Sequence, residues 1–219
     1  MTFCRRLDHQ LRLERVRIAL CIGFLLCLLI AIPARAANGP GSVGSAAIVE
    51  QLHARLLKVM KVARNLEIAE RFKRLEPAVA DAYSMAKMLH LTVGSEWSKA
   101  RPDQRERLLN AFSDISVGTY ARRFNGYSGE HFKTIAARPG PRGTILVETQ
   151  IVRREKAPVL LTYVTLKVGK NWRIVDVLLD NAISELAVRR SEYRRIVQRD
   201  GIDGLIRALR KKADALIPR

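Results

Sequence analysis

"PVLLTYVTLKVGKNWRIVDVLLD", residues 158–180, is the stretch that decides the fold class. Two runs rich in Val, Ile, Leu, Thr and aromatic residues flank the short turn Gly169-Lys170-Asn171. That composition is typical of β-strands, and a connection this short joins antiparallel neighbours. Residues 143–155 have the same character, and residues 130–137 indicate one shorter strand. The sequence therefore predicts an antiparallel sheet of about four to five strands.

Helical periodicity precedes and follows this sheet. Apolar residues recur at helical spacing over residues 48–66, 67–94, 102–124 and 184–216. Pro77 is expected to begin a new helix, because a proline removes an interior hydrogen bond. Gly201 is expected to end the first of two closing helices. The predicted fold class is α+β, with helices packed on the sheet, and the large supply of apolar faces favours an apolar cavity between the two layers.

The first 36 residues have the layout of a secretory signal peptide. A basic segment precedes fifteen apolar or small residues, 18–32, and an A-x-A site follows at Ala34-Arg35-Ala36. A helix of that length spans about 22 Å, short of the roughly 30 Å of a bilayer core, so cleavage is favoured over a retained anchor. We expect residues 1–36 to be the signal peptide, residues 37–46 a flexible Gly/Ser/Pro linker, and residues 47–219 a single domain.

The cysteine content and the net charge of that domain are interpreted here for an exported protein. All three cysteines lie before residue 37, so the domain must be stabilised by its core without a disulfide. The chain has 39 Lys and Arg against 21 Asp and Glu; residues 1–36 hold six and two of these, which leaves a net charge of about +14. Outside the cytoplasm the abundant polyanions are lipid headgroups and glycans. Transient contact with an anionic membrane is therefore expected rather than nucleic-acid binding, with simple solubility as the competing explanation.

The reactive residues form no coherent catalytic or metal site. Ser128 lacks the G-x-S-x-G context of a nucleophile elbow, and its flanking helix and strand come in the reverse order. His53, His90 and His131 lie far apart and form no H-x-x-x-H pair, so no metal is predicted. The sequence contains no glycine-rich phosphate loop either, and no cofactor is predicted. Ser128, Glu130 and His131 are interpreted as turn and surface groups.

Asp176 keeps an enzyme hypothesis open. Two-residue alternation places its carboxylate on the same face as Trp172, Ile174 and Leu178. A buried carboxylate costs several kcal/mol unless it is paired or hydrogen-bonded. Asp176 is therefore a candidate general base of a cone-fold enzyme that acts on a sterol-like or polyisoprenoid lipid. The favoured interpretation is an ion pair with Arg122 or Arg190, in a protein that is not an enzyme.

Four stretches, in this order along the chain, resemble a known family. They are "RFKRLEPAVADAYSMAKMLHLTVGSEWSKARPDQRERLLNAF" (71–112), "TYARRFNGYSGEHF" (119–132), "WRIVDVLLDNAISELAVRRSEYRRIV" (172–197) and "GIDGLIRALRKKA" (201–213). Together they are similar to the MlaC family of periplasmic lipid-binding proteins, also called toluene-tolerance proteins. Within that family, these stretches most resemble the sequences of the hopanoid-associated HpnM branch. The resemblance covers nearly all of the chain after residue 46.

The resemblance implies a curved antiparallel sheet covered by helices, with a deep apolar cavity for acyl chains and the headgroup near its mouth. It also implies a periplasmic carrier of phospholipid or hopanoid, with a part in outer-membrane lipid asymmetry. Its partners would be an inner-membrane transport complex, of the ABC/MCE type or an RND-type hopanoid exporter, and an outer-membrane lipoprotein complex. Residues 47–219 would then be a single lipid-binding domain.

Candidate cavity residues follow from strand alternation and helix stripes. In the predicted strands they are Val147, Ile151, Val164, Leu166, Val175 and Val177. In the predicted helices they are Leu89, Phe112, Ile115, Tyr120 and Phe124. Ordinary core packing explains each of these positions at least as well.

Overall fold

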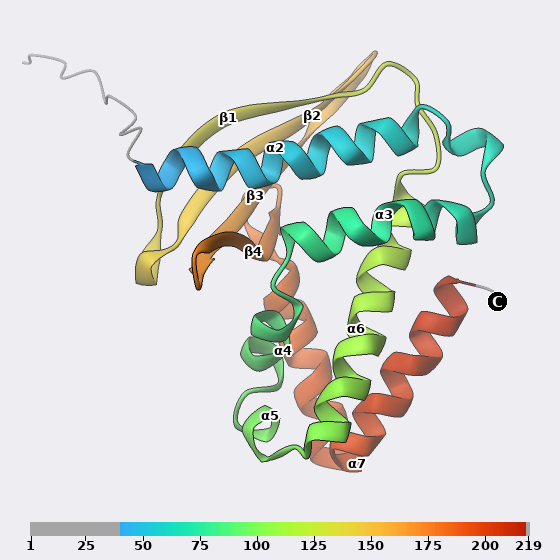
Figure 1. Ribbon diagram of the computed structural model, residues 1–219, viewed down its shortest axis with the longest axis vertical. Helices are drawn as coiled ribbons and strands as arrows, with labels where there is room; N and C mark the ends of the chain where they lie inside the picture. The colour runs from blue at the N-terminus through green and yellow to red at the C-terminus, as the bar shows by residue number, and fades with distance from the viewer. Residues whose placement is uncertain (1–39, 218–219) are drawn as a thin grey trace, which may run out of the picture. The chain divides into compact units, whose positions relative to one another are not determined.

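The computed structural model describes residues 40–217, so the expected signal peptide and residues 37–39 lie outside the described residues (Figure 1). The helical elements are α2 (Pro40–Met60), the 3₁₀ turn η1 (Ala63–Asn65), α3 (Ile68–Ala82), α4 (Met85–Val93), α5 (Ser95–Lys99), α6 (Pro102–Arg123), the 3₁₀ turn η2 (Pro141–Gly143) and α7 (Glu185–Leu216). The strands are β1 (His131–Pro139), β2 (Ile145–Arg153), β3 (Lys156–Val168), β4 (Asn171–Leu179) and β5 (Ile183–Ser184).

The strands form one five-stranded antiparallel sheet in the order β1-β2-β3-β4-β5. Its register sets Val147 opposite Tyr163, and Tyr163 opposite Val177, so these side chains share one face. In Figure 1, α2 runs along the sheet, where it contacts β1, β2 and β4, while α6 packs beside α7 and α3. The α+β prediction, with helices packed on an antiparallel sheet, is confirmed.

Residues 40–46 are not the linker that the sequence predicts, because α2 already begins at Pro40. The glycines and serines of this segment allow close packing rather than flexibility. A Cβ atom at Gly44 would come within 2.7 Å of the Trp172 ring, and one at Gly41 within 3.2 Å of it. Ser42 and Ser45 are both buried. Small residues are thus required where the first turns of α2 meet the indole of β4.

Adding a side chain at Gly44 should weaken this contact. We expect Gly44→Val to lower the free energy of unfolding by about 2 kcal/mol, a typical overpacking cost. Chemical denaturation measures this change. In a Trp172→Ala background the penalty should largely disappear, because the two residues form one contact. An equal penalty in both backgrounds would contradict the packing explanation.

Within the helical run predicted at residues 67–94, the first break falls at Tyr83, and the predicted break at Pro77 is wrong. Pro77 lies inside α3, whose buried stripe of Leu75, Ala78, Val79 and Ala82 continues past the proline. Packing of this stripe against α2 and α6 outweighs the one hydrogen bond that a proline removes. At Tyr83 the backbone becomes extended and forms a bridge with Ile174 of β4, and the Ser84 N–H donates to the Ile174 carbonyl at 3.0 Å.

The predicted stop at Gly201 corresponds to a sharp break within α7. Gly201 has φ 66° and ψ −172°, a backbone conformation that glycine adopts without steric cost. Figure 1 shows the two arms of α7 that meet near this point. Within residues 40–217, none of the helices combines the length and apolar character needed to cross a bilayer.

Candidate functional site

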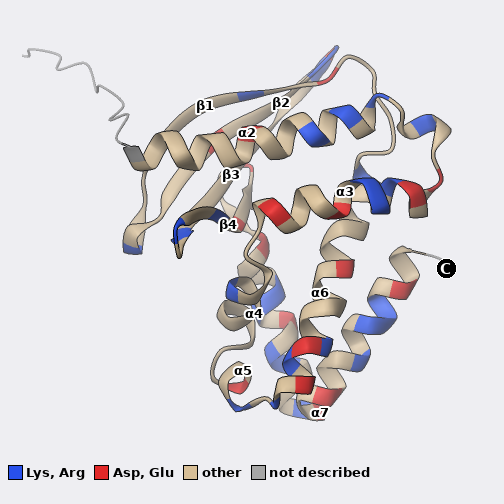
Figure 2. Cartoon of the chain, viewed as in Figure 1, with Lys and Arg blue, Asp and Glu red and all other residues tan. Residues whose placement is uncertain are grey.

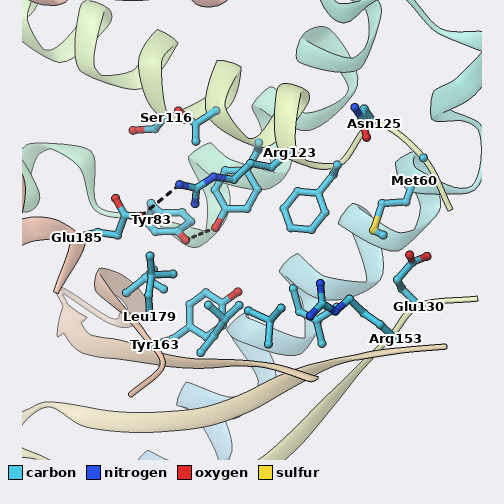
Figure 3. A pocket seen from close by; sticks show the side chains of 18 of the residues that line it. Met60, Tyr83, Ser116, Arg123, Asn125, Glu130, Arg153, Tyr163, Leu179 and Glu185 are labelled. Atoms are coloured by element: carbon cyan, nitrogen blue, oxygen red, sulfur yellow. Dashed lines mark hydrogen bonds and ion pairs between the residues drawn. The ribbon is translucent and has the colours of Figure 1, made fainter. Parts of the chain in front are cut away.

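A cavity of about 550 Å³ lies between the helices and the sheet (Figure 3). Its apolar lining consists of Met60, Met88, Phe124, Ile151, Val159, Leu161, Val177 and Leu179. Its polar lining consists of three tyrosines (Tyr83, Tyr120, Tyr163), six charged residues (Arg64, Arg123, Glu130, Arg153, Glu185, Arg189), Ser116, Thr119, Asn125, Gly126 and Ser128. The volume falls in the range of roughly 300–1,000 Å³ that is usual for small-ligand sites.

Strand alternation builds the floor of the cavity. Val159, Leu161 and Tyr163 occupy alternate positions of β3 and so point to the same face of the sheet. On β4, Val177 pairs with Tyr163 and Leu179 with Leu161, which continues this face to the next strand. The opposite wall comes from the last turns of α6 and from the segment that follows it. The wall therefore includes the passage from helix layer to sheet layer at residues 124–130.

Four predicted cavity residues line this space: Tyr120, Phe124, Ile151 and Val177. Five others, Leu89, Phe112, Ile115, Val147 and Val175, are buried in the packed core and do not line the cavity. Val164 and Leu166 are half-buried and lie, by alternation, on the face of β3 opposite to Tyr163. Sequence periodicity assigns a residue to one face of a strand or helix, but it does not tell whether that face borders packed side chains or open space.

Three tyrosines, Tyr83, Tyr120 and Tyr163, line the cavity, and Figure 3 labels Tyr83 and Tyr163. The hydroxyl oxygens of Tyr83 and Tyr120 lie 2.5 Å apart, and either can be the donor. Burial raises the pKa of Tyr83 and of Tyr163 well above the ordinary value, and the neighbouring Tyr120 adds to both shifts. All three groups therefore stay protonated and can donate hydrogen bonds.

His53 extends this set of hydroxyls into the contact between α2 and the sheet. Its Nε2 atom lies 3.0 Å from the Tyr163 hydroxyl, and its ring stacks on Phe132 of β1 with centroids 4.2 Å apart. The side chain is buried, and burial lowers its pKa to about 4. At neutral pH the ring is therefore uncharged and can either donate to or accept from Tyr163. In the sequence, His53 has no metal-ligand spacing that would mark it as a site residue.

The shifted pKa of His53 makes stability depend on pH. Unfolded histidine titrates near 6.5, so the unfolded chain binds the extra proton between about pH 6.5 and pH 4, and stability falls as the pH falls through that window. From pH 7 to pH 5 this group should remove about 2 kcal/mol. Denaturation at both pH values should show this loss in the parent protein, and it should be smaller by that amount in His53→Gln, which keeps a partner for Tyr163. Equal pH dependence in the two proteins would contradict the assignment.

Charged groups stand at both ends of the cavity. Figure 3 places Glu185 at one end, and Glu130 and Arg153 at the other. Arg123 of α6 pairs with Glu185 at 3.5 Å, and the Glu130 carboxylate accepts from the Ser128 backbone N–H at 2.5 Å. Ser128 and Glu130, interpreted from the sequence as turn and surface groups, thus also border the cavity.

Asp176 does not face the cavity; it shares a face with Leu178 as predicted, but the prediction that it also shares this face with Trp172 and Ile174 is wrong. A register shift in the β3–β4 pairing sets Asp176 opposite Val164 and Ile174 opposite Thr165, which reverses the alternation between Ile174 and Asp176. The carboxylate accepts hydrogen bonds from the Ser184 hydroxyl at 2.5 Å, the Leu186 N–H at 3.0 Å and the Val177 N–H at 2.8 Å. It therefore stabilises the start of α7.

The predicted ion pair of Asp176 with Arg122 or Arg190 is also wrong, since among residues 40–217 it forms no ion pair with either arginine. Hydroxyl and backbone donors satisfy the carboxylate instead. The same part of the chain contains no group of three His, Cys, Asp or Glu side chains that could hold a metal ion. The residue proposed as a general base, Asp176, therefore does not lie in the cavity, and the enzyme hypothesis has no support from it.

A helical layer over an antiparallel sheet, with a largely apolar cavity between them, defines a class of α+β ligand-binding proteins. The chain belongs to the MlaC family: the sequence profile of that family, described as "MlaC protein", matches residues 50–211. No curated protein matches the chain.

A solved structure shares this fold. It is a phospholipid-binding protein from Ralstonia solanacearum, determined in complex with a phospholipid. The two chains superpose with a TM-score of 0.70 at 18% identity, over 78% of this chain and 98% of the other. At that level of identity the likeness establishes the fold alone.

Proposed function

We propose that the protein is a carrier of lipid, which it holds in the cavity between the helices and the sheet. The observation that carries this proposal is the chemistry of the cavity lining: an apolar interior from β2, β3, β4 and α6 that ends in charged groups. An amphipathic ligand matches that distribution, with its chains inside and its headgroup at an end. The phospholipid in the related structure and membership of the MlaC family support a binding role rather than catalysis.

A protein can carry lipid without any catalytic group if its cavity shields the acyl chains from water. Exposing an acyl chain to water costs about 0.8 kcal/mol per CH₂, so a two-chain lipid faces a barrier near 20 kcal/mol when it leaves a bilayer unshielded. A cavity that replaces the bilayer removes most of this barrier. Cargo must also leave, and flexible side chains such as Met60 and Met88 in the lining suit a ligand that is held without a rigid fit.

Four arginines and two glutamates line the cavity, so its charged groups favour an anionic headgroup. We infer a phospholipid or a hopanoid as cargo; the hopanoid is suggested by the likeness to the HpnM branch. The signal peptide predicted at residues 1–36 indicates a periplasmic site of action. The partners proposed are an inner-membrane complex, of the ABC/MCE type or an RND-type hopanoid exporter, and an outer-membrane lipoprotein complex.

Transient contact with anionic membranes is part of the proposal. Figure 2 shows Lys and Arg distributed over α2, α3 and α7. Each basic side chain close to an anionic surface contributes about 1 kcal/mol of attraction. This attraction would bring the carrier to a bilayer without a permanent anchor and weaken as salt is raised.

Lipid transfer between two vesicle populations tests the proposal. Purified protein is added to donor vesicles with a fluorescent phospholipid and unlabelled acceptor vesicles of phosphatidylglycerol and phosphatidylcholine. The expected result is transfer in proportion to protein concentration, slower at high salt. A transfer rate equal to that without protein would contradict a carrier role.

A further inference from the structure

Two hydrogen-bonded pairs bring three tyrosine hydroxyls to the wall of the cavity. The His53 Nε2 atom lies 3.0 Å from the Tyr163 hydroxyl, and the hydroxyls of Tyr83 and Tyr120 lie 2.5 Å apart. His53, Tyr163 and Tyr83 are at most 6% exposed to solvent, yet all three tyrosines border the cavity. Among the described residues, the Tyr83 hydroxyl has no hydrogen-bond partner except Tyr120. These hydroxyls thus form a polar group on the wall of the cavity, beside the apolar side chain of Val177.

The hydroxyl protons determine what this group can offer to a ligand. One proton fills the contact between Tyr83 and Tyr120, so one O–H of this pair is left as a donor. When the His53 Nε2–H donates to Tyr163, the Tyr163 O–H is left as a second donor; when Nε2 instead accepts, the Tyr163 O–H fills that contact. The neutral His53 ring allows both arrangements, and the Tyr83–Tyr120 pair can donate to a ligand oxygen in either of them.

Packing alone does not explain these hydroxyls. A buried polar group without a full set of hydrogen bonds is costly, whereas phenylalanine would fill the same volume without that cost. Phe124 stacks on Tyr120 and Phe132 stacks on His53, so phenylalanine already occupies positions in this layer. Retaining three hydroxyls on the wall of a cavity is accounted for when a ligand atom completes their hydrogen bonding.

We propose that the hydroxyls of Tyr83, Tyr120 and Tyr163 form an internal polar anchor that binds one uncharged oxygen atom of the lipid. Such an oxygen is either the ester carbonyl of an acyl lipid or the hydroxyl of a polycyclic lipid, and both can accept from the free O–H of the Tyr83–Tyr120 pair. The anchor rests on the proposed lipid-binding function and adds selectivity to it. It sets the position of the ligand along the cavity, which apolar contacts alone do not fix.

Competition between matched lipids tests the anchor. The purified protein is incubated with vesicles that contain equal amounts of an ester-linked and an ether-linked phosphatidylglycerol of the same chain length, re-isolated, extracted and analysed by mass spectrometry. A second competition uses cholestanol and cholestane, which differ in one hydroxyl. One hydrogen bond corresponds to about a five-fold preference for the oxygenated lipid. The pair that shows the preference identifies the source of the oxygen.

Hydroxyl variants complete the test. The double variant Tyr83→Phe, Tyr120→Phe removes the pair, and it should bring the preference for the oxygenated lipid to about one-fold among the lipid that the variant takes up. Tyr193→Phe is the matched control, because Tyr193 is buried but does not line the cavity, and it should keep the preference of the parent protein. Equal uptake within both lipid pairs by the parent protein, or a preference that survives the double variant, would overturn the anchor and leave the carrier role standing. No uptake of any lipid would overturn both.

Discussion

Replacing Val177 by tryptophan is expected to remove lipid from the purified protein almost completely. Val177 lies on β4 opposite Tyr163, and its side chain lines the floor of the cavity. An indole at this position would occupy space that acyl chains need. Excluding even four methylene groups costs about 3 kcal/mol, which corresponds to a loss of more than 100-fold in affinity. Mass spectrometry of solvent extracts, with phosphate normalised to protein, measures the change.

A tryptophan elsewhere in the sheet provides the control. Val168 ends β3, is 40% exposed and does not line the cavity, so Val168→Trp adds the same side chain without filling the space. It should retain the lipid content of the parent protein. Both variants should keep the far-UV circular dichroism of the parent. Full lipid occupancy in folded Val177→Trp would contradict the placement of the ligand between the layers.

Replacing Asp176 by alanine should cause the largest loss of stability predicted here, about 3 kcal/mol. The carboxylate accepts from two backbone N–H groups and the Ser184 hydroxyl, and hydrogen bonds to charged groups contribute about 1.5–3 kcal/mol each. One of these donors is the Leu186 N–H in the first turn of α7, which has no acceptor within the helix. Removing the carboxylate leaves these donors partly unsatisfied. Urea denaturation monitored by circular dichroism gives the difference.

Asp176→Asn separates the structural role from a catalytic one. An asparagine keeps one carbonyl oxygen, which can still accept from the Val177 and Leu186 N–H groups, so the cost should stay below about 1 kcal/mol. Lipid content should be unchanged in this variant. A general base would instead lose its function in both variants, whatever their stability. A loss below 1 kcal/mol for Asp176→Ala would contradict the role assigned to the carboxylate.

The sheet was predictable from the sequence because β-branched residues and short turns act locally. The runs around Gly169-Lys170-Asn171 predict a hairpin, and β3 and β4 pair across it. The face of Asp176 was not predictable, because a shifted register changes the alternation and leaves no local mark in the residues. The helical start of α2 was missed for a similar reason: Gly44 looks like a linker residue until Trp172, far along the chain, is placed beside it.

The cavity itself was only partly predictable. Val147 and Ile151 lie on the same face of β2, but Val147 is in the packed core and Ile151 lines the cavity. Alternation determines the face of the strand on which a side chain lies. Whether that side chain is packed in the core or lines the cavity depends on which part of the face the helices cover. Tyr83 was missed because the helix break that directs it into the cavity arises from a bridge to Ile174, not from a proline. The position of Tyr163 followed from alternation once the correct face of β3 was known.

Extraction of the purified protein with organic solvent is the most direct test of the claim that this cavity holds lipid. The chain without residues 1–36 is purified without detergent, its extract is identified by mass spectrometry, and the molar ratio of lipid to protein is determined. The cavity and its charged ends predict phospholipid or hopanoid at close to one molecule per chain in the parent protein, with little in Val177→Trp. A parent protein free of lipid that also takes none up from phosphatidylglycerol vesicles would contradict the claim.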